Sequence, residues 1–212
     1  KFNFPELNHK YNIHLNKEIQ LCPEAITSNC LYTITCIDGV NGEKLSPSWL
    51  KDRLEKSGIK SINLLVDLTN YILLEQGQPL HAFDKEKLSN LIGKEVSVDD
   101  FSVRKAKDSE SLVCLDGKKY DLNEKIVVIT CCDKPVAIAG VIGGLETSVT
   151  NTTSSIYLEG AVFNPVIIRK SSKEIGIRTE SSSRYEKGIS SKNTIFAVTR
   201  AINLLEENFT IN

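Results

Sequence analysis

The sequence of 212 residues contains no methionine and only three histidines, and none of its apolar runs approaches the length of a bilayer-spanning helix. It also lacks the charged start and the apolar stretch of a secretory signal. We therefore expect a cytoplasmic protein without a membrane segment. Because the chain starts at Lys1 and has no methionine, we expect an internal piece of a longer protein, although a processed terminus would look the same.

Several familiar catalytic patterns are absent. The sequence has no Gly-x-Ser-x-Gly elbow, no His-Glu-x-x-His, no Gly-x-x-x-x-Gly-Lys-Ser/Thr loop and no Gly-x-Gly-x-x-Gly after a strand. The six cysteines show no Cys-x-x-Cys spacing and no histidine partner, so we expect neither a metal site nor a disulfide framework. Small buried thiols in a reducing compartment are the state expected for Cys22, Cys30, Cys36, Cys114, Cys131 and Cys132.

The net charge of −1 argues against strong overall attraction to nucleic acid, but the charge is unevenly distributed. Residues 164–200 carry eight Lys or Arg and three Glu, so this segment has a charge of 8 − 3 = +5. Such a segment is either a face that contacts a phosphate backbone or a solvated helix surface, and the sequence leaves both open. Its basic residues are Arg169, Lys170, Lys173, Arg178, Arg184, Lys187, Lys192 and Arg200.

Residue patterning predicts two consecutive helices in the first half of the chain. The first is expected to have Ser46 as its cap and Pro47 as its first residue, and to close at Gly58. The second is expected to have Ser61 as its cap and to end at Gly77, with a proline beyond it. Both segments carry apolar residues at helical spacing, so each should bury one face.

The rest of the chain mixes strands and helices without a regular βαβ rhythm, which indicates an α+β fold. We expect mixed sheets with flanking helices, in two intimately packed halves that form one domain over residues 31–212, with residues 1–30 as a lead-in segment. Strands are expected at 31–37, within 93–130 around an Asp116-Gly117 hairpin turn, and at 154–163. Helices are expected from Asn164-Pro165 to Gly176 and from about Ser191 to Glu207.

Four polar side chains interrupt apolar segments. Thr69 and Asn70 lie within the apolar pattern of the second helix, His81 follows a Gly-Gln-Pro break, and Glu159 lies in the apolar strand IYLEGAVF. Each has an ordinary interpretation as a solvent-facing or structural residue. If Glu159 faces inward, its carboxyl group must be paired or must be an acceptor for a ligand. The turn AIAGVIGG would let backbone approach such a ligand closely.

The stretches VDLTNY, GQPLHAFD, AIAGVIGG, YLEGAVFNP and GIRTESSSRYEKG occur in this order. They resemble the B3/B4 region of the beta subunit of bacterial-type phenylalanyl-tRNA synthetases, and the resemblance covers most of residues 30–200. It implies an editing domain that hydrolyses tyrosine wrongly attached to tRNA(Phe). The ligase site, with its ATP and magnesium, would lie elsewhere in the parent enzyme. The implied partners are the tyrosine-bearing 3′ end of tRNA(Phe) and the alpha subunit of the parent heterotetramer, with no cofactor, metal or membrane for this fragment.

The resemblance also implies roles for individual residues. Thr69, Asn70 and His81 would be catalytic, and Glu159 would accept a hydrogen bond from the tyrosine hydroxyl. Other substrate-binding positions would be Pro79, Ala82, Gly140, Gly143, Thr179 and Ser181. The sequence departs from the family pattern at Ser181, where many relatives carry Ala, and at Gly160-Ala161, where Ser-Ala is common. We expect the Ser181 hydroxyl to alter the pocket floor.

These residue types suit the hydrolysis of an aminoacyl ester. The reaction needs an oriented water and donors for the oxyanion, but no acyl-enzyme, which agrees with the missing nucleophile motifs. Backbone N–H groups of residues 140–143 are expected to face the oxyanion. Whether His81 removes a proton or only orients the water is left open. The alternatives are a non-catalytic module that positions tRNA or the partner subunit, and a free-standing deacylase.

Overall fold

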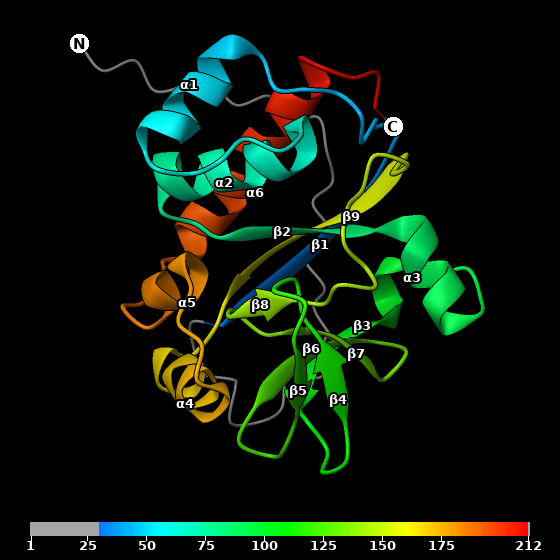
Figure 1. The fold of residues 1–212 in the computed structure, drawn as a ribbon, viewed down its shortest axis with the longest axis vertical. Helices are drawn as coiled ribbons and strands as arrows, with labels where there is room; N and C mark the ends of the chain where they lie inside the picture. Colours follow the sequence, from blue (N-terminus) through cyan, green and yellow to red (C-terminus); the bar gives the residue numbers. More distant parts are fainter. Residues whose placement is uncertain (1–29, 212) are drawn as a thin grey trace.

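The computed structural model describes residues 30–211, so most of the expected lead-in segment, including Cys22, lies outside the described residues. Figure 1 shows the arrangement of the elements. In chain order they are β1 (Leu31–Asp38), α1 (Ser48–Lys56), α2 (Leu64–Gln76), β2 (Leu80–Asp84), α3 (Lys85–Ile92), the 3-10 helix η1 (Val98–Asp100), β3 (Phe101–Lys105), β4 (Ser111–Val113), β5 (Lys119–Asp121), β6 (Val127–Cys131), β7 (Lys134–Ile138), β8 (Ile142–Gly143), β9 (Ser155–Val162), α4 (Pro165–Ile175), α5 (Glu180–Tyr185) and α6 (Ser191–Glu206).

A three-stranded antiparallel sheet in the order β1-β9-β2 lies between the other layers. β9 is its central strand, and every residue of β9 after Ser155 is buried, as expected for a strand covered on both faces. In the register, Glu159 of β9 lies opposite Ile34 of β1 on one side and opposite His81 of β2 on the other. Directly opposed residues project from the same face, so His81 and Glu159 point to the same side of the sheet.

The two faces of this sheet contact two different hydrophobic cores. On one face, Leu158 belongs to a core with residues of α1, α2 and α6, the helices at the top of Figure 1. On the other face, Tyr157 and Phe83 belong to a core with the four-stranded sheet β3-β6-β7-β8. The expected α+β class is therefore confirmed, and all strand pairings among residues 30–211 are antiparallel.

The β4–β5 hairpin confirms the turn predicted at Asp116-Gly117, where Gly117 adopts a φ of 78°. The hairpin is fastened to the glycine-rich turn, because the Leu115 N–H donates to the Gly143 carbonyl at 3.0 Å. Cys114 and Gly144 form an isolated antiparallel bridge beside this bond. The β4–β5 hairpin and the glycine-rich turn, which are distant in the sequence, are thus joined by backbone pairing.

The predicted helix ends are confirmed at Gly77 and Gly176, which close α2 and α4 in the left-handed region with φ of 69° and 72°. The cap predicted for the second helix is wrong. α2 begins after Asn63, whose side chain accepts from the Val66 N–H at 3.0 Å. Because Asn63 supplies this acceptor, Ser61 is not needed at the helix end.

The cap predicted for the first helix is also wrong, since Pro47 is the residue that precedes α1 and makes no side-chain cap. Ser46 and Ser61 both donate instead to the buried carboxylate of Asp67, as does the Ile62 N–H at 2.8 Å. This carboxylate holds together the loops that flank α1. The sequence pattern does not reveal Asp67, because its partners lie 5 to 21 residues away.

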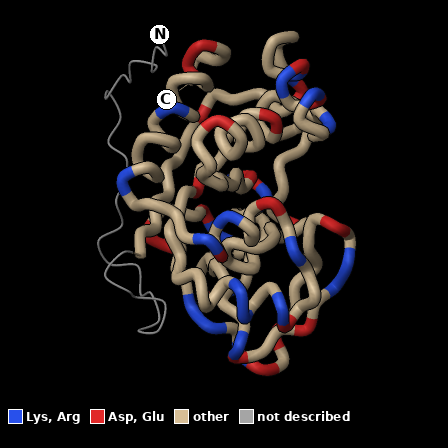
Figure 2. The backbone as a smooth tube through the Cα atoms, turned by 90° about the vertical axis from the view of Figure 1, so that its left-hand side faces the viewer, with Lys and Arg blue, Asp and Glu red and all other residues tan. Residues whose placement is uncertain are grey.

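The surface carries both signs of charge, interspersed over the face that Figure 2 presents. Part of the basic charge of residues 164–200 is paired. The ion pairs are Arg169–Glu186 at 3.9 Å, Arg184–Glu180 at 2.6 Å and Arg200–Glu75 at 3.4 Å.

Within residues 30–211, no helix combines the length and the apolar character that crossing a membrane requires. Cys36, Cys114, Cys131 and Cys132 lie outside any disulfide. Cys114 and Cys131 are buried as expected, whereas Cys132 is exposed because it lies in the tight β6–β7 turn with a φ of 46°.

Candidate functional site

A cavity of about 280 Å³ opens where the edge of the three-stranded sheet meets α2, the glycine-rich turn and the start of α5. Its size lies near the lower end of the range of small-molecule pockets, about 300 to 1,000 Å³. Most of its wall is apolar. The polar groups are few and come from distant parts of the sequence: Thr69, Asn70, His81, Glu159, Thr179, Glu180, Ser181 and Tyr185.

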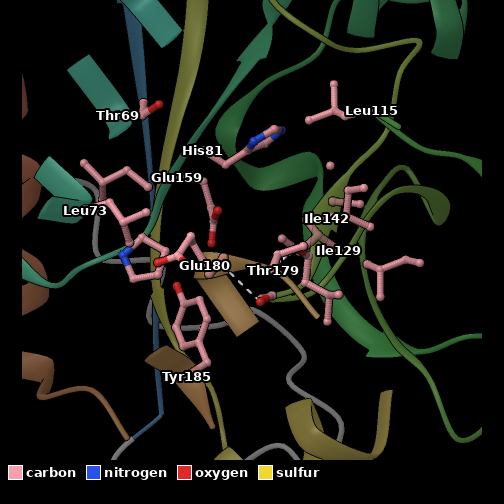
Figure 3. A pocket seen from close by; sticks show the side chains of 18 of the residues that line it. Thr69, Leu73, His81, Leu115, Ile129, Ile142, Glu159, Thr179, Glu180 and Tyr185 are labelled. Carbon is pink, nitrogen blue, oxygen red and sulfur yellow. Dashed lines mark hydrogen bonds between the residues drawn. The ribbon is translucent and has the colours of Figure 1, made fainter. Parts of the chain in front are cut away.

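His81 and Glu159 are two titratable groups of this wall that face each other. They oppose each other across the β2–β9 ladder, and Figure 3 shows both side chains directed into the cavity. Glu159 is only 5% exposed, because β9 is the central strand, whereas His81 on the edge strand is half-buried. The Nε2 of His81 and the Oε1 of Glu159 are buried and have no hydrogen-bond partner within residues 30–211.

Burial keeps both groups uncharged near neutral pH. Desolvation lowers the pKa of His81 to about 4 and raises the pKa of Glu159 to about 8. At pH 7 the cavity therefore holds a neutral imidazole and a largely protonated carboxyl group. Of the six buried side-chain atoms without a partner in residues 30–211, only these two belong to residues that line the cavity, so a ligand in the cavity can supply their partners.

Two tyrosines flank Glu159, and the sequence analysis missed both. Tyr185 lies in the cavity wall and donates from its hydroxyl to the Ala161 carbonyl at 3.1 Å. The hydroxyl of Tyr32 is buried and has no partner among the described residues. The pKa of each phenol is raised well above its usual value, first by burial and next by the nearby Glu159. Tyr32 precedes Glu159 by 127 positions, so only the β1–β9 pairing reveals their proximity.

The glycines of the turn are required for different reasons. A Cβ at Gly143 would lie 2.5 Å from Cε1 and 2.8 Å from Nε2 of His81, so the imidazole rests directly on this backbone. Gly140 has a φ of +66°, and a Cβ there would approach the side chains of Ile168, Tyr185 and Phe163 at 3.0 to 3.1 Å. Of the N–H groups in this turn, that of Val141 is already donated to Ile138 at 3.0 Å.

Thr179 and Ser181 attach the start of α5 to the same turn. The Thr179 hydroxyl donates to the Val141 carbonyl at 2.8 Å and accepts from the Ser182 N–H at 3.0 Å, as the cap of α5. The Ser181 hydroxyl donates to the Gly140 carbonyl at 3.1 Å. Both side chains line the cavity, but their hydroxyl protons are used in holding the wall together.

Thr69 and Asn70 line the opposite side of the cavity, on α2. The Thr69 hydroxyl donates back to the Val66 carbonyl at 2.8 Å, which leaves its lone pairs available on the cavity side. Pro79 also belongs to the wall and is held in place by Gln78. The buried Gln78 amide donates to the carbonyls of Pro79 and Ala161, each at 3.0 Å.

Two positions from the sequence analysis lie outside the cavity. Ala82 alternates with His81 along β2, so it faces the opposite core with α2 and α6, and it is not part of the wall. Gly160 alternates with Glu159 in the same way. A Cβ at Gly160 would lie 2.6 Å from Cγ2 of Val198 on α6. The departure from the family pattern at Gly160 therefore concerns helix packing and not the pocket.

Within residues 30–211, no group of three or more His, Cys, Asp or Glu side chains is placed to hold a metal ion. Of the His, Cys, Asp and Glu side chains that line the cavity among the described residues, only His81 and Glu159 belong to the three-stranded sheet. The third, Glu180, forms an ion pair with Arg184. The residues present can offer an uncharged imidazole, a carboxyl group and backbone dipoles to a small organic ligand.

Comparison with known proteins places these residues in a family context. A family model described as "B3/4 domain" matches residues 28–210. The chain is 88% identical over its whole length to a phenylalanine–tRNA ligase beta subunit of Prochlorococcus marinus (strain MIT 9312), of which it covers 26%. It is 49% identical over 180 residues, 85% of its length, to the corresponding subunit of Synechococcus sp. (strain CC9605), of which it covers 22%.

The chain thus spans about a quarter of the length of the curated relatives that it matches. Among solved structures, an N-terminal fragment of the phenylalanyl-tRNA synthetase beta-subunit from Pyrococcus horikoshii is a weak match. The match has a TM-score of 0.41 and 14% sequence identity. It covers 68% of the present chain and 45% of the Pyrococcus horikoshii chain.

Proposed function

Because the chain belongs to the B3/4 domain family, we propose that it is the editing module of a phenylalanyl-tRNA synthetase and hydrolyses the ester of tyrosine mischarged onto tRNA(Phe). In this proposal the ligase site, with ATP and magnesium, lies in other parts of the full-length enzyme. The enzyme pairs the beta subunit with an alpha subunit and acts in the cytoplasm. The names of the relatives state a phenylalanine–tRNA ligase beta subunit, and the proposal extends this identity to the present chain and adds the editing activity.

The observation that carries the proposal is the carboxyl group of Glu159 in the cavity wall, whose Oε1 has no partner among the described residues. An apolar wall formed by residues such as Ile129, Ile138 and Val141 suits an aromatic ring. At the end of that ring, the free Oε1 of Glu159 can accept the phenol O–H of tyrosine. Phenylalanine would leave this oxygen unpaired. Sites that bind a substrate hydroxyl in this way discriminate against the analogue that lacks it by roughly 10⁴-fold or more.

The second part of the proposal concerns the water. His81 lies closer to solvent than Glu159, so a tyrosine that reaches Glu159 with its phenol presents its ester near the imidazole. The neutral imidazole has a free lone pair or N–H at Nε2, which can orient a water toward the ester carbonyl. With a pKa of about 4, His81 is a weak base, so orientation of the water is its main contribution.

The developing negative charge on the ester oxygen needs donors. The backbone of the glycine-rich turn lies against the His81 ring at Gly143, so this turn is the nearest source of N–H donors. Asn70 and Thr69, which line the wall on α2, are the residues that we propose to hold the ribose hydroxyl. Each of these roles is carried by groups that need no covalent intermediate with the protein.

The test is deacylation of tyrosyl-tRNA(Phe) and phenylalanyl-tRNA(Phe) by the full-length two-subunit enzyme, as wild type and as His81→Ala. We expect the variant to lose tyrosyl-tRNA hydrolysis by about 100-fold, a typical effect for loss of a group that positions the reacting water. Aminoacylation by the same preparation is the internal control and should be unchanged. Normal hydrolysis by His81→Ala would make His81 structural, and absence of hydrolysis in the wild type would favour a module that only positions tRNA or the partner subunit.

A further inference from the structure

Two exposed leucines, whose side chains the proposed hydrolysis does not use, lie beside the cavity. Leu115 is 46% exposed and Leu145 is 42% exposed. They belong to two short segments, residues 113–115 and 143–145, which pair side by side and which we name the mouth ledge. Two backbone hydrogen bonds hold the ledge together: the Leu115 N–H donates to the Gly143 carbonyl at 3.0 Å, and the Leu145 N–H donates to the Val113 carbonyl at 2.9 Å. Between them, Cys114 and Gly144 form an isolated antiparallel bridge.

The pairing determines which side chains share a face of the ledge. Leu115 opposes Gly143, and Val113 opposes Leu145, so these four residues project from the same side. Gly143 leaves a gap in this face, and the His81 ring fills it at less than 3 Å from where a Cβ would be. Leu115 Cδ1 lies 3.2 Å from the same point. Figure 3 shows the His81 ring between Glu159 and Leu115.

The order Glu159, His81, Leu115 therefore follows one line from the interior to the surface. If the phenol of the substrate reaches Glu159 and its ester lies at His81, the group attached to the alcohol side of the ester must emerge over Leu115. In an aminoacyl-tRNA this group is the terminal ribose and its base. A nucleoside has a flat apolar face, and a shelf of exposed leucine side chains is a surface that such a face can cover.

We propose that the mouth ledge binds the terminal nucleoside of the substrate. Leu115 is the main contact, and Leu145 lies at the outer end of the ledge. This inference rests on the proposed function, because it uses the orientation of a tyrosyl ester in the cavity. It explains why two large apolar side chains remain exposed beside a polar catalytic group, and it adds a specificity for nucleoside esters over simple esters of tyrosine.

The experiment compares two ligands in the full-length two-subunit enzyme. One is 3′-tyrosylamino-3′-deoxyadenosine, an amide that cannot be hydrolysed at an appreciable rate, and the other is tyrosinamide, which lacks the nucleoside. Affinities are measured for the wild type, Leu115→Ala and Leu115→Met. The matched control is Leu45→Ala, since Leu45 is 75% exposed, precedes α1 and lies outside the cavity wall.

We expect Leu115→Ala to weaken binding of the nucleoside amide roughly fivefold to tenfold, the effect of losing a partly covered leucine contact. Binding of tyrosinamide should be unchanged, Leu115→Met should restore most of the affinity, and Leu45→Ala should match the wild type. In steady-state hydrolysis of tyrosyl-tRNA, Leu115→Ala should raise KM with little change in kcat.

Equal losses for both ligands, or a loss in kcat alone, would overturn the proposal, because Leu115 would then act only by packing against His81. No effect on either ligand would overturn it as well and would indicate that another part of the full-length protein covers the ledge. An enzyme that hydrolyses no tyrosyl ester but still shows the selective loss for the nucleoside amide would retain the ledge and reject the editing function.

Discussion

Two buried carboxyl groups of this protein lie in opposite electrostatic situations. Asp67, in the region between α1 and α2, is fully buried and accepts from two serine hydroxyls and a backbone N–H. Glu159, in the region of the cavity, is almost as deeply buried, yet its Oε1 has no partner within residues 30–211. Burial alone therefore does not separate a structural carboxyl group from a functional one.

The difference lies in the partners. A carboxylate with several donors is stabilised in its charged form and fixes the segments that supply those donors. A buried carboxyl group without a donor costs folding free energy, and such a cost persists at sites where a ligand supplies the missing partner. Asp67 therefore stabilises the fold, whereas we propose that Glu159 accepts a hydrogen bond from a ligand hydroxyl. The following experiments test this contrast.

The largest expected effect is on selectivity. Replacing Glu159 with Ala should abolish the preference for tyrosyl-tRNA over phenylalanyl-tRNA in deacylation, a change of up to roughly 10⁴-fold. Glu159→Gln keeps an acceptor of the same shape and should retain part of the preference. The measurement is the ratio of kcat/KM for the two substrates in the full-length enzyme. A Glu159→Ala enzyme with normal selectivity would show that the phenol is recognised elsewhere.

Asp67 should show the opposite behaviour. Asp67→Ala removes the acceptor of three hydrogen bonds and should lower the free energy of unfolding by about 2 to 4 kcal/mol, measured by urea denaturation. Asp67→Asn keeps one acceptor oxygen and should lose less. In the fraction that remains folded, the selectivity ratio should equal that of the wild type. A loss of selectivity without a loss of stability would contradict the structural role.

The pH dependence of stability sharpens the contrast further. Folded Glu159 has a pKa raised to about 8 from 4.5, so above pH 4.5 the unfolded chain has released a proton that the folded chain keeps, and stability falls as pH rises toward 8. His81, with a pKa lowered to about 4 from 6.5, contributes a rise in stability between pH 4 and 6.5, which offsets this fall in that range.

The net decline should therefore appear between pH 6.5 and 8, with a slope of at most about 1.4 kcal/mol per pH unit. Urea unfolding of wild type and Glu159→Gln at pH 6.5 and pH 8 gives the measurement. The variant has no ionisable group at this position, so its stability should exceed that of the wild type by more at pH 8 than at pH 6.5. A constant difference at both pH values would show that Glu159 is charged in the folded protein.

The smallest expected effects compare two glycines. Gly77 has a φ of +69° with open space around it, so Gly77→Ala should cost only about 1 kcal/mol of stability through backbone strain and leave hydrolysis unchanged. Gly143→Ala would push against His81, at 2.5 Å from its Cε1. This variant should reduce hydrolysis at least about tenfold while unfolding at a similar denaturant concentration. Equal activity in both variants would mean that the His81 position does not matter.

Much of the secondary structure follows from local sequence. The turn at Asp116-Gly117 and the glycine ends at Gly77 and Gly176 depend on conformations that few other residues adopt, so short patterns predict them. Helix starts were less predictable. Ser46 and Ser61 had the right residue type for a cap, but both hydroxyls donate to the Asp67 carboxyl group, which lies 21 and 6 residues further along the chain.

In the candidate site, too, some features follow from local sequence and others depend on residues that are distant in the chain. By itself, the sequence determined the α+β class, the glycine ends of α2 and α4 and, through resemblance, the identity of Thr69, Asn70, His81 and Glu159 as residues of interest.

Only the tertiary structure decided that β2 pairs with β9, since such long-range pairing depends on packing and not on local propensity. That register places His81 opposite Glu159. Because side chains alternate along a strand, this register directs Ala82 and Gly160 to the opposite core. It leaves the Oε1 of Glu159 without a partner among residues 30–211.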